Sequence, residues 1–327
     1  MASTSWARMD RLLKAGKQIL SNPSVIIWIV VAFLLVLARI ISAAFLDVTH
    51  MLNLIRQASG LGIVTIGQTL VILTGGIDLS NGPVITLVDV LAATILKGKD
   101  DLLIPVILLC LTIGVIVGLV NGFLITKLKV PPLVGTLGMF GIIKGIAYVL
   151  TKGAPKGKIP PSLTFVGSGF VGPIPTQVFF WVGLTIIFLF IIYITPYGRL
   201  IYSVGGNPKA ARLSGVNVDW IIISTYIISS GLAATAGLIL AGYIGTGSLT
   251  LGEGYNLNSV AATVVGGTSF SGGVGSLIGS VGGSLFLSIV ISLLRFLGLP
   301  YSNQLMVQGA ILAVAIFIHS RTQQQSS

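Results

Sequence analysis

The stretch 102–125 reads LLIPVILLCLTIGVIVGLVNGFLI and contains no charged side chain. An α-helix needs about 20 apolar residues to cross the hydrocarbon core of a bilayer, and this stretch is long enough. Comparable runs recur along the chain, from 23–45 near its beginning to 303–318 near its end. The repetition predicts an all-α, polytopic integral membrane protein. The first run has no small-residue cleavage site after it, so we interpret it as a retained span rather than a signal peptide.

The composition supports the same class. Of the 327 residues, 54% are hydrophobic and 8% are charged, whereas soluble domains carry about 25% charged residues. A net charge of +11 would suggest nucleic-acid binding in a soluble domain. Here the basic residues lie mostly between apolar runs, so we interpret them as topology signals and contacts to membrane lipids, with no nucleic-acid partner.

The charge distribution predicts which loops face the cytoplasm. Segment 1–22 carries four basic residues and one acidic residue between apolar positions, so we expect an amphipathic helix on the cytoplasmic surface. We then expect a transmembrane domain over 23–318 and a cytoplasmic tail over 319–327. This topology places Lys127, Lys129 and Arg212 inside. Outside it places Arg56, Lys97, Lys99, Lys152, Lys156 and Lys158.

About ten spans follow from this topology. The span near 256–266 is short and bounded by glycine, so its alternative is a re-entrant segment lined by protein or water. A proline- and glycine-rich stretch, 151–176, cannot continue a helix and is expected to form an ordered external loop. The spans are expected near 23–45, 58–74, 83–96, 102–126, 133–150, 177–195, 219–245, 256–266, 274–296 and 303–318.

The residues that usually carry metal, redox or nucleotide chemistry are sparse. The single cysteine, Cys110, lies within an apolar run, and the two histidines, His50 and His319, stand far apart. A disulfide within the chain and a zinc site are therefore not expected. We also expect no catalytic residues and no cofactor, and the sequence contains no GxxxxGK[ST] phosphate loop.

Glycines stand within the apolar runs as well as between them. Gly114 and Gly118 have GxxxG spacing, as do Gly275 and Gly279. Small residues let helices approach closely in a membrane. We therefore predict close helix packing at these positions, without a ligand role.

Two short stretches that interrupt apolar runs resemble each other, 75–82 (GGIDLSNG) and 266–273 (GGTSFSGG). Broken helices in matching places indicate a transport pathway, because their free backbone groups can face a polar solute or a gate. A chance match between glycine-rich segments is the alternative. The candidate pathway or gate residues are Asp78, Ser80, Asn81, Asp89, Thr268, Ser269 and Ser271.

Two acidic residues near these interruptions leave alternatives open. Asp78 either belongs to a helix start, with Ser80 or Asn81 as the cap, or acts in gating. Asp89 lies deeper, where an ionisable residue is a functional hypothesis, and Lys144 is a possible counter-ion. Proton coupling through Asp89 keeps an ion-gradient-driven secondary transporter as the alternative function. An intramembrane enzyme is disfavoured, because no catalytic cluster stands at a useful spacing.

The longest predicted cytoplasmic loop is 196–218, which reads PYGRLIYSVGGNPKAARLSGVNV. Asn207 followed by Pro208 is typical of a helix start, and Gly215 is well placed to end a helix. We therefore predict a short helix on the cytoplasmic face, which a motor subunit could push.

The motifs GGIDLS (75–80), GRLIYSVGGNPKAARLSGVNV (198–218) and GYNLNSVAATVVGGTSFSGGVGSLIG (254–279) resemble the ribose-type permease subunits of bacterial ABC importers, over nearly the whole chain. The resemblance implies a permease subunit of the bacterial inner membrane that carries a sugar or similar small polar solute. The implied partners are an ATPase subunit or fused tandem ATPase, a second permease copy or a homologous permease, and an extracytoplasmic solute-binding protein.

The resemblance also assigns roles within the chain. Region 198–218 corresponds to the coupling helix that docks on the ATPase. Two departures, at 81–83 and at Asn258, where the family often has an acidic residue, leave the solute open. Apart from the resemblance, the stretch 245–258 is rich in glycine and polar groups between two apolar runs. We therefore expect Glu253, Asn256 and Asn258 outside, where they would help to receive the binding protein, and a merely solvated loop is the alternative. The residues expected to couple to the ATPase are Gly205, Asn207, Lys209, Ala211, Arg212 and Gly215.

Overall fold

The computed structural model describes residues 23–324. The prediction of an amphipathic helix over 1–22 lies outside the described residues, as do the last three residues of the predicted tail. The described part of that tail is not a separate segment, because the last helix continues as far as Gln324.

The described residues form thirteen α-helices, one short 3-10 helix and one two-stranded hairpin, so the all-α class is confirmed. The hairpin pairs β1 (Phe170–Val171) with β2 (Ile174–Pro175). The helices are α2 (Pro23–Ile41), η1 (Ala43–Leu46), α3 (Val48–Leu73), α4 (Asn81–Leu96), α5 (Leu103–Thr126), α6 (Pro132–Thr151), α7 (Pro161–Ser168), α8 (Thr176–Ile194), α9 (Pro196–Gly206), α10 (Pro208–Leu213), α11 (Val218–Ile244), α12 (Tyr255–Val265), α13 (Leu277–Phe296) and α14 (Tyr301–Gln324).

Six helices within residues 23–324 are long and apolar enough to cross a membrane, namely α2, α5, α6, α8, α11 and α13. The other four predicted spans fall on α3, α4, α12 and α14. Helix α3 has 26 residues, which is about 39 Å at 1.5 Å per residue, and its second half is buried by its neighbours. The 16 residues of α4 and the 11 of α12 are too few to cross alone.

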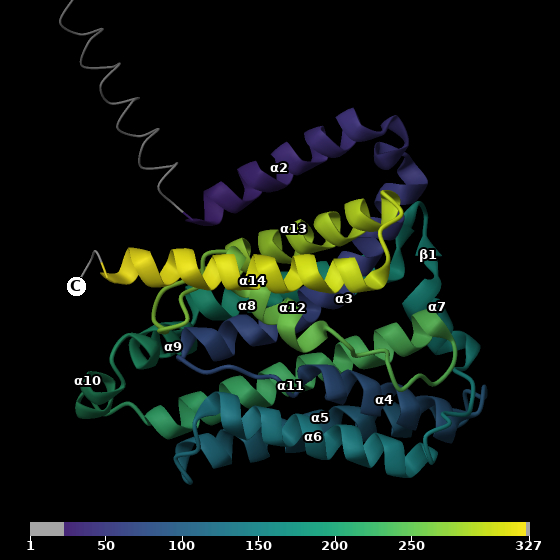
Figure 1. The fold of residues 1–327 in the computed structure, drawn as a ribbon. Helices are drawn as coiled ribbons and strands as arrows, with labels where there is room; N and C mark the ends of the chain where they lie inside the picture. The colour runs from purple at the N-terminus through teal and green to yellow at the C-terminus, as the bar shows by residue number, and fades with distance from the viewer. Residues whose placement is uncertain (1–22, 325–327) are drawn as a thin grey trace, which may run out of the picture.

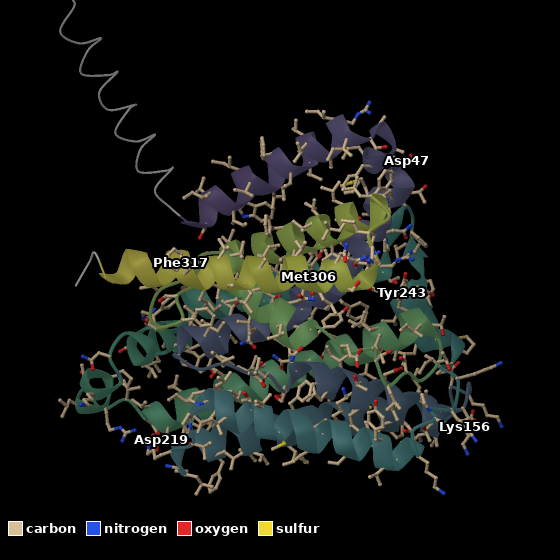
Figure 2. The ribbon with its side chains drawn as sticks, viewed as in Figure 1. Asp47, Lys156, Asp219, Tyr243, Met306 and Phe317 are labelled. Carbon is tan, nitrogen blue, oxygen red and sulfur yellow. The ribbon has the colours of Figure 1, made fainter. Side chains whose placement is uncertain are left out.

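The helices lie side by side, with α2 at one edge of the molecule and α5 and α6 at the opposite edge (Figure 1). Helix α11 packs against α3, α4 and α5 in the middle. Helix α10 lies at one end of the bundle, whereas α7 and β1 lie at the other. Figure 2 shows Asp219 at the first end and Asp47 and Lys156 at the second.

The two ends separate the basic residues as the topology predicted. Lys127 and Arg212, both expected inside, form ion pairs with Asp219 at 2.7 Å and 2.6 Å. At the other end the N–H of Gly98 donates to the carbonyl of Lys158 at 2.8 Å. Which end faces the cytoplasm stays a prediction from the charge bias.

Glycines on one face of α5 allow its close approach to α11. A Cβ at Gly114 would lie 2.7 Å from the carbonyl oxygen of Ser230, and one at Gly122 would lie 2.7 Å from the Cα of Ile223. Gly118 faces the backbone of Tyr226 in the same way. The close packing predicted at Gly114 and Gly118 is therefore confirmed.

The loop predicted over 196–218 is wrong in its first half, which is helix α9. Helix α9 buries Gly198, Ile201 and Val204, which recur every three residues and so lie on one side of a helix. The stretch is too short to span a membrane, and this is why the hydropathy pattern did not mark it. The predicted short helix in the second half is confirmed as α10.

Arg56 is also misplaced by the sequence prediction, which put it in an outer loop. The chain is already helical from Val48, so Arg56 stands inside α3 and is only 9% exposed. Its guanidinium carbon lies 4.6 Å from the centre of the Phe170 ring. Contact with this aromatic face from the β1–β2 hairpin stabilises the charge away from water.

Candidate functional site

The two similar glycine-rich segments meet each other at the end of α9. The N–H of Gly273 donates to the carbonyl of Leu73 at 2.9 Å. A Cβ at Gly272 would lie 2.8 Å from the nitrogen of Gly75 and 3.0 Å from the oxygen of Gly205. Three backbone segments are therefore in direct contact, and only residues without side chains allow it. We call this contact, at Leu73, Gly205 and Gly273, the glycine junction.

The second segment forms a compact turn between α12 and α13. The Thr268 hydroxyl lies 3.4 Å from the Ser280 hydroxyl, and the N–H of Ser269 donates to Val274 at 2.8 Å. The N–H of Ser271 donates to the Ser269 hydroxyl at 3.2 Å. Thr268 and Ser269 are buried, so in this conformation they shape the turn, and their pathway role stays a prediction.

Asp78 is fully buried and accepts several hydrogen bonds. Its Oδ1 accepts from the backbone N–H and the hydroxyl of Ser80, at 2.9 Å and 2.6 Å. Its Oδ2 accepts from the hydroxyl of Ser229 at 3.0 Å. Helix α4 begins at Asn81, and the Ser80 side chain makes no cap hydrogen bond. The predicted helix start is confirmed, but the Ser80 hydroxyl serves Asp78 instead of the helix.

The same polar cluster joins four helices. The side-chain amide of Asn121 in α5 donates to Ser80 at 2.9 Å, and Ser229 in α11 donates to Asn81 at 3.2 Å. The Nδ2 of Asn81 lies 3.0 Å from the side-chain amide of Gln68 in α3. Sequence reasoning missed Gln68, Asn121 and Ser229, although Gln68 and Asn121 each stand alone as an amide in an apolar stretch.

Asp89 is buried in the middle of α4 but has no lysine partner in the described residues. Its Oδ2 accepts from the backbone N–H of Ser248 at 2.7 Å, and its Oδ1 has no hydrogen-bond partner. Lys144, the suggested counter-ion, instead pairs with Glu253 at 3.7 Å. The suggested Asp89–Lys144 pair is therefore wrong, because Asp89 faces Ser248 in the first part of the loop 245–254 whereas Lys144 reaches Glu253 near the end of that loop.

The predicted coupling residues gather around α10. The Oδ1 of Asn207 accepts from the N–H of Ala210 at 3.0 Å, which confirms the predicted cap. Gly215 follows the helix with a φ of +85° and confirms its predicted end. Lys209 is exposed and Ala211 is buried. Gly205 lies near the end of α9, three residues before α10 begins, and belongs to the glycine junction.

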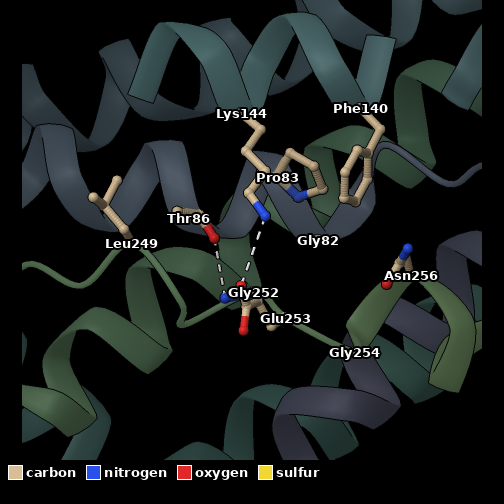
Figure 3. Close-up of a pocket in the computed structure, with 10 residues that line it drawn as sticks. All are labelled: Gly82, Pro83, Thr86, Phe140, Lys144, Leu249, Gly252, Glu253, Gly254 and Asn256. Atoms are coloured by element: carbon tan, nitrogen blue, oxygen red, sulfur yellow. Dashed lines mark hydrogen bonds and ion pairs between the residues drawn. The ribbon is translucent and has the colours of Figure 1, made fainter. Parts of the chain in front are cut away.

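A cavity of about 210 Å³ lies where α4 and α12 begin (Figure 3). Helix α6 closes one side with Phe140 and Lys144, which point toward Pro83 and Glu253. The N–H of Gly252 donates to the hydroxyl of Thr86 at 3.1 Å and ties the loop before α12 to α4. The remaining lining residues are Gly82, Leu249, Gly254 and Asn256.

The residues predicted to receive a binding protein line two neighbouring cavities that share Glu253. Asn256 lines this cavity with Glu253, and Asn258 lines a second cavity, of about 150 Å³, with Glu253 and Arg295. Thr86, beside Gly252, stands ten residues before the end of α4 at Leu96. That is about 15 Å from the Leu96 end of α4 at 1.5 Å per residue, so the loop 245–254 descends into the bundle.

Comparisons with known proteins agree over most of the chain. Residues 50–316 match the family described as "Branched-chain amino acid transport system / permease component". The chain is 36% identical over 288 residues to the ribose import permease protein RbsC of Bacillus subtilis (strain 168), covering 87% of this chain and 89% of the relative. It is 35% identical to RbsC of Escherichia coli (strain K12), covering 89% and 92%.

The name of a third relative refers to a different sugar. The chain is 33% identical over 312 residues to the galactose/methyl galactoside import permease protein MglC of Escherichia coli (strain K12), covering 90% of this chain and 93% of the relative. No solved structure gives a significant match.

Proposed function

Because the chain belongs to the family of branched-chain amino acid transport system permease components, we propose that it is the permease subunit of an ATP-binding-cassette importer for a sugar. It is a multi-pass protein of the inner membrane. Its relatives are sugar import permeases of nearly the same length. The ion-gradient alternative is set aside, since these relatives are import permeases and the lysine invoked for it pairs with Glu253.

The observation that carries the mechanism is the glycine junction. Helix α10 follows Gly205 and Gly206 directly, and these glycines touch the end of α3 and the loop before α13. A displacement of α10 by an ATPase would therefore reach both interrupted segments through contacts between backbones. Such contacts cannot adjust by changing a side-chain rotamer, so they favour rigid-body movement between two packed states.

The membrane topology follows from the same assignment. We propose ten crossings, by α2, α3, α4, α5, α6, α8, α11, α12, α13 and α14. Helices α4 and α12 are short because non-helical segments, 74–80 and 245–254, precede them. Such backbone is tolerated at membrane depth where protein or water surrounds it. The polar cluster around Asp78 would hold the first of these segments in place.

The partners are proposed from the family. An ATPase subunit, or a fused tandem ATPase, would dock on α10, and hydrolysis would occur there. A solute-binding protein would dock at the opposite end and act on the loop that carries Glu253 and on the start of α12, which carries Asn256 and Asn258. A second permease, identical or homologous, would complete the pathway, and lipids would cover the remaining apolar surface.

Reconstitution tests this function. The chain is purified with its ATPase and placed in liposomes, and uptake of ribose, galactose and methyl galactoside is measured with the binding protein. We expect uptake of one of these sugars that requires ATP and both partners. Uptake by the chain alone, driven by a proton or sodium gradient, would contradict the proposal.

A further inference from the structure

Lys144 and Glu253 form an ion pair well inside the length of the bundle. Lys144 stands seven residues before the end of α6 at Thr151, which is about 10 Å from that end. Ile142 and Ile146 stand two positions away along α6, on the side opposite to Lys144, and are exposed apolar residues, as lipid contact requires. Charged residues at this depth are energetically costly, and they usually mark a functional site.

The ion pair is loose and accessible. The Nζ of Lys144 lies 3.7 Å from Oε1 of Glu253, and the side chains are 38% and 47% exposed. A partly exposed pair of this kind contributes little to stability. Stability of the fold therefore does not explain why these two residues are charged. Either charged group can exchange its partner with little loss of folding free energy.

Within residues 23–324, no base other than Lys144 forms an ion pair with Glu253, although Glu253 also lines the neighbouring cavity of about 150 Å³. Arg295 lines that cavity with Glu253, but its Nη1 donates to Gln57 at 2.8 Å and its Nε donates to Gln304 at 3.2 Å. Lys144 is the base that faces Glu253. The pair is neutral as a whole, so the cavity favours neither anions nor cations.

The cavity combines hydrogen-bonding groups with flat apolar surfaces. The Lys144 ammonium donates, the Glu253 carboxylate accepts, and the amide of Asn256 does both. Thr86 adds a hydroxyl, while Phe140 and Pro83 supply apolar faces. A ligand that matches this lining carries hydroxyl groups on an apolar carbon ring. An apolar lining with a few polar groups is typical of a small-molecule site.

We propose that this cavity is a solute-contact site within the permease, where Lys144 and Glu253 part from each other and hydrogen-bond the hydroxyl groups of a neutral polyhydroxylated solute. This inference deepens the proposed function and rests on it. The site lies where the two interrupted helices α4 and α12 meet, so a movement of either segment changes its shape. A solute that displaces the ion pair also frees the loop 245–254 from α6.

Uptake by the reconstituted complex tests the site. Lys144→Met and Glu253→Gln remove one charge each and keep the side-chain length. We expect each to lower sugar uptake at least tenfold, while pull-down of the ATPase shows that the variants fold and assemble. Lys152→Met, at the end of the same helix, and Asp100→Asn, an exposed carboxylate, serve as matched controls with near wild-type uptake. Wild-type uptake by both cavity variants would overturn the site.

Thiol labelling tests solute contact directly. In a Cys110→Ala background, Leu249→Cys places a thiol on the cavity lining and leaves Lys144 and Glu253 in place, and Ile146→Cys is the control on the side of α6 opposite to Lys144. We expect Cys at position 249 to react with a charged, water-soluble thiol reagent, and to react more slowly while sugar is being transported, whereas position 146 stays unlabelled. A rate at position 249 that sugar does not change would remove the solute-contact role.

The two levels of proposal fail in different ways. If the wild-type complex takes up no sugar, the proposed function falls and the site falls with it. If the wild type transports sugar but the cavity variants match it, only the site is lost.

Discussion

The N–H of Gly273 donates to the carbonyl oxygen of Leu73 over 2.9 Å, which joins the loop before α13 to the end of α3. Gly205, at the end of α9, is packed against both residues. Two interrupted segments that are almost 200 positions apart in the chain thus share one contact point with the helix that precedes α10. Changes at this point are expected to affect transport more than changes one residue away.

Gly205→Ala should damage this junction. A Cβ there would overlap the carbonyl of Leu73 and the nitrogen of Gly273, whereas a Cβ at Gly206 would meet nothing within 4 Å. Overpacking costs about 1–3 kcal/mol, so we expect a lower thermal unfolding midpoint and reduced uptake for Gly205→Ala. Gly206→Ala is the matched control and should resemble wild type. Equal behaviour of the two variants would refute the junction as drawn.

Arg212→Ala should lower solute-stimulated ATP hydrolysis and uptake together. Arg212 pairs with Asp219 at 2.6 Å, and its guanidinium offers several directed donors for a partner subunit. Its exposed ion pair contributes only about 0–1 kcal/mol, so thermal unfolding should barely change. Both activities are measured in nanodiscs with the ATPase.

Lys127→Ala is the control for Arg212, because it removes the other ion pair of Asp219 and leaves α10 intact. We expect it to keep both activities. If Arg212→Ala also keeps them, Arg212 is only a topology signal.

Asp78→Ala should destabilise the protein. The substitution leaves the buried hydroxyl and the backbone N–H of Ser80 without the acceptor that both share. Each buried polar group left without a partner costs about 1–3 kcal/mol. We expect a clear fall in the thermal unfolding midpoint in detergent, compared with Asp101→Ala at an exposed position. An unchanged midpoint would mean that the cluster contributes nothing to the fold.

Gly114→Leu should prevent the close approach of α5 and α11. A Cβ at Gly114 would already lie 2.7 Å from the carbonyl of Ser230, whereas one at Gly138 in α6 would meet nothing within 4 Å. We expect poor recovery of monodisperse protein for Gly114→Leu and normal recovery for Gly138→Leu, measured by size-exclusion chromatography. Normal recovery of both would show that α5 can shift to accommodate the side chain.

Much of the site could be anticipated from local patterns. The Asn207 cap and the Gly215 stop were predicted because capping depends on residues a few positions apart. The similarity of 75–82 and 266–273 pointed to segments that do touch. The Asp89–Lys144 pairing failed because a partner on another helix depends on how the helices rotate, and one sequence does not contain that information.

The sequence by itself determined that the chain is a membrane protein of many helices, because the length and apolarity of each run depend only on neighbouring residues. It also determined where the helices break, since glycine and proline act locally. Only the tertiary structure decided which residues meet. It buried Asp78 among hydroxyls from α11, paired Lys144 with Glu253, and brought the loop 245–254 down to Thr86. These contacts join residues more than 100 positions apart, so they arise from packing rather than from any local pattern.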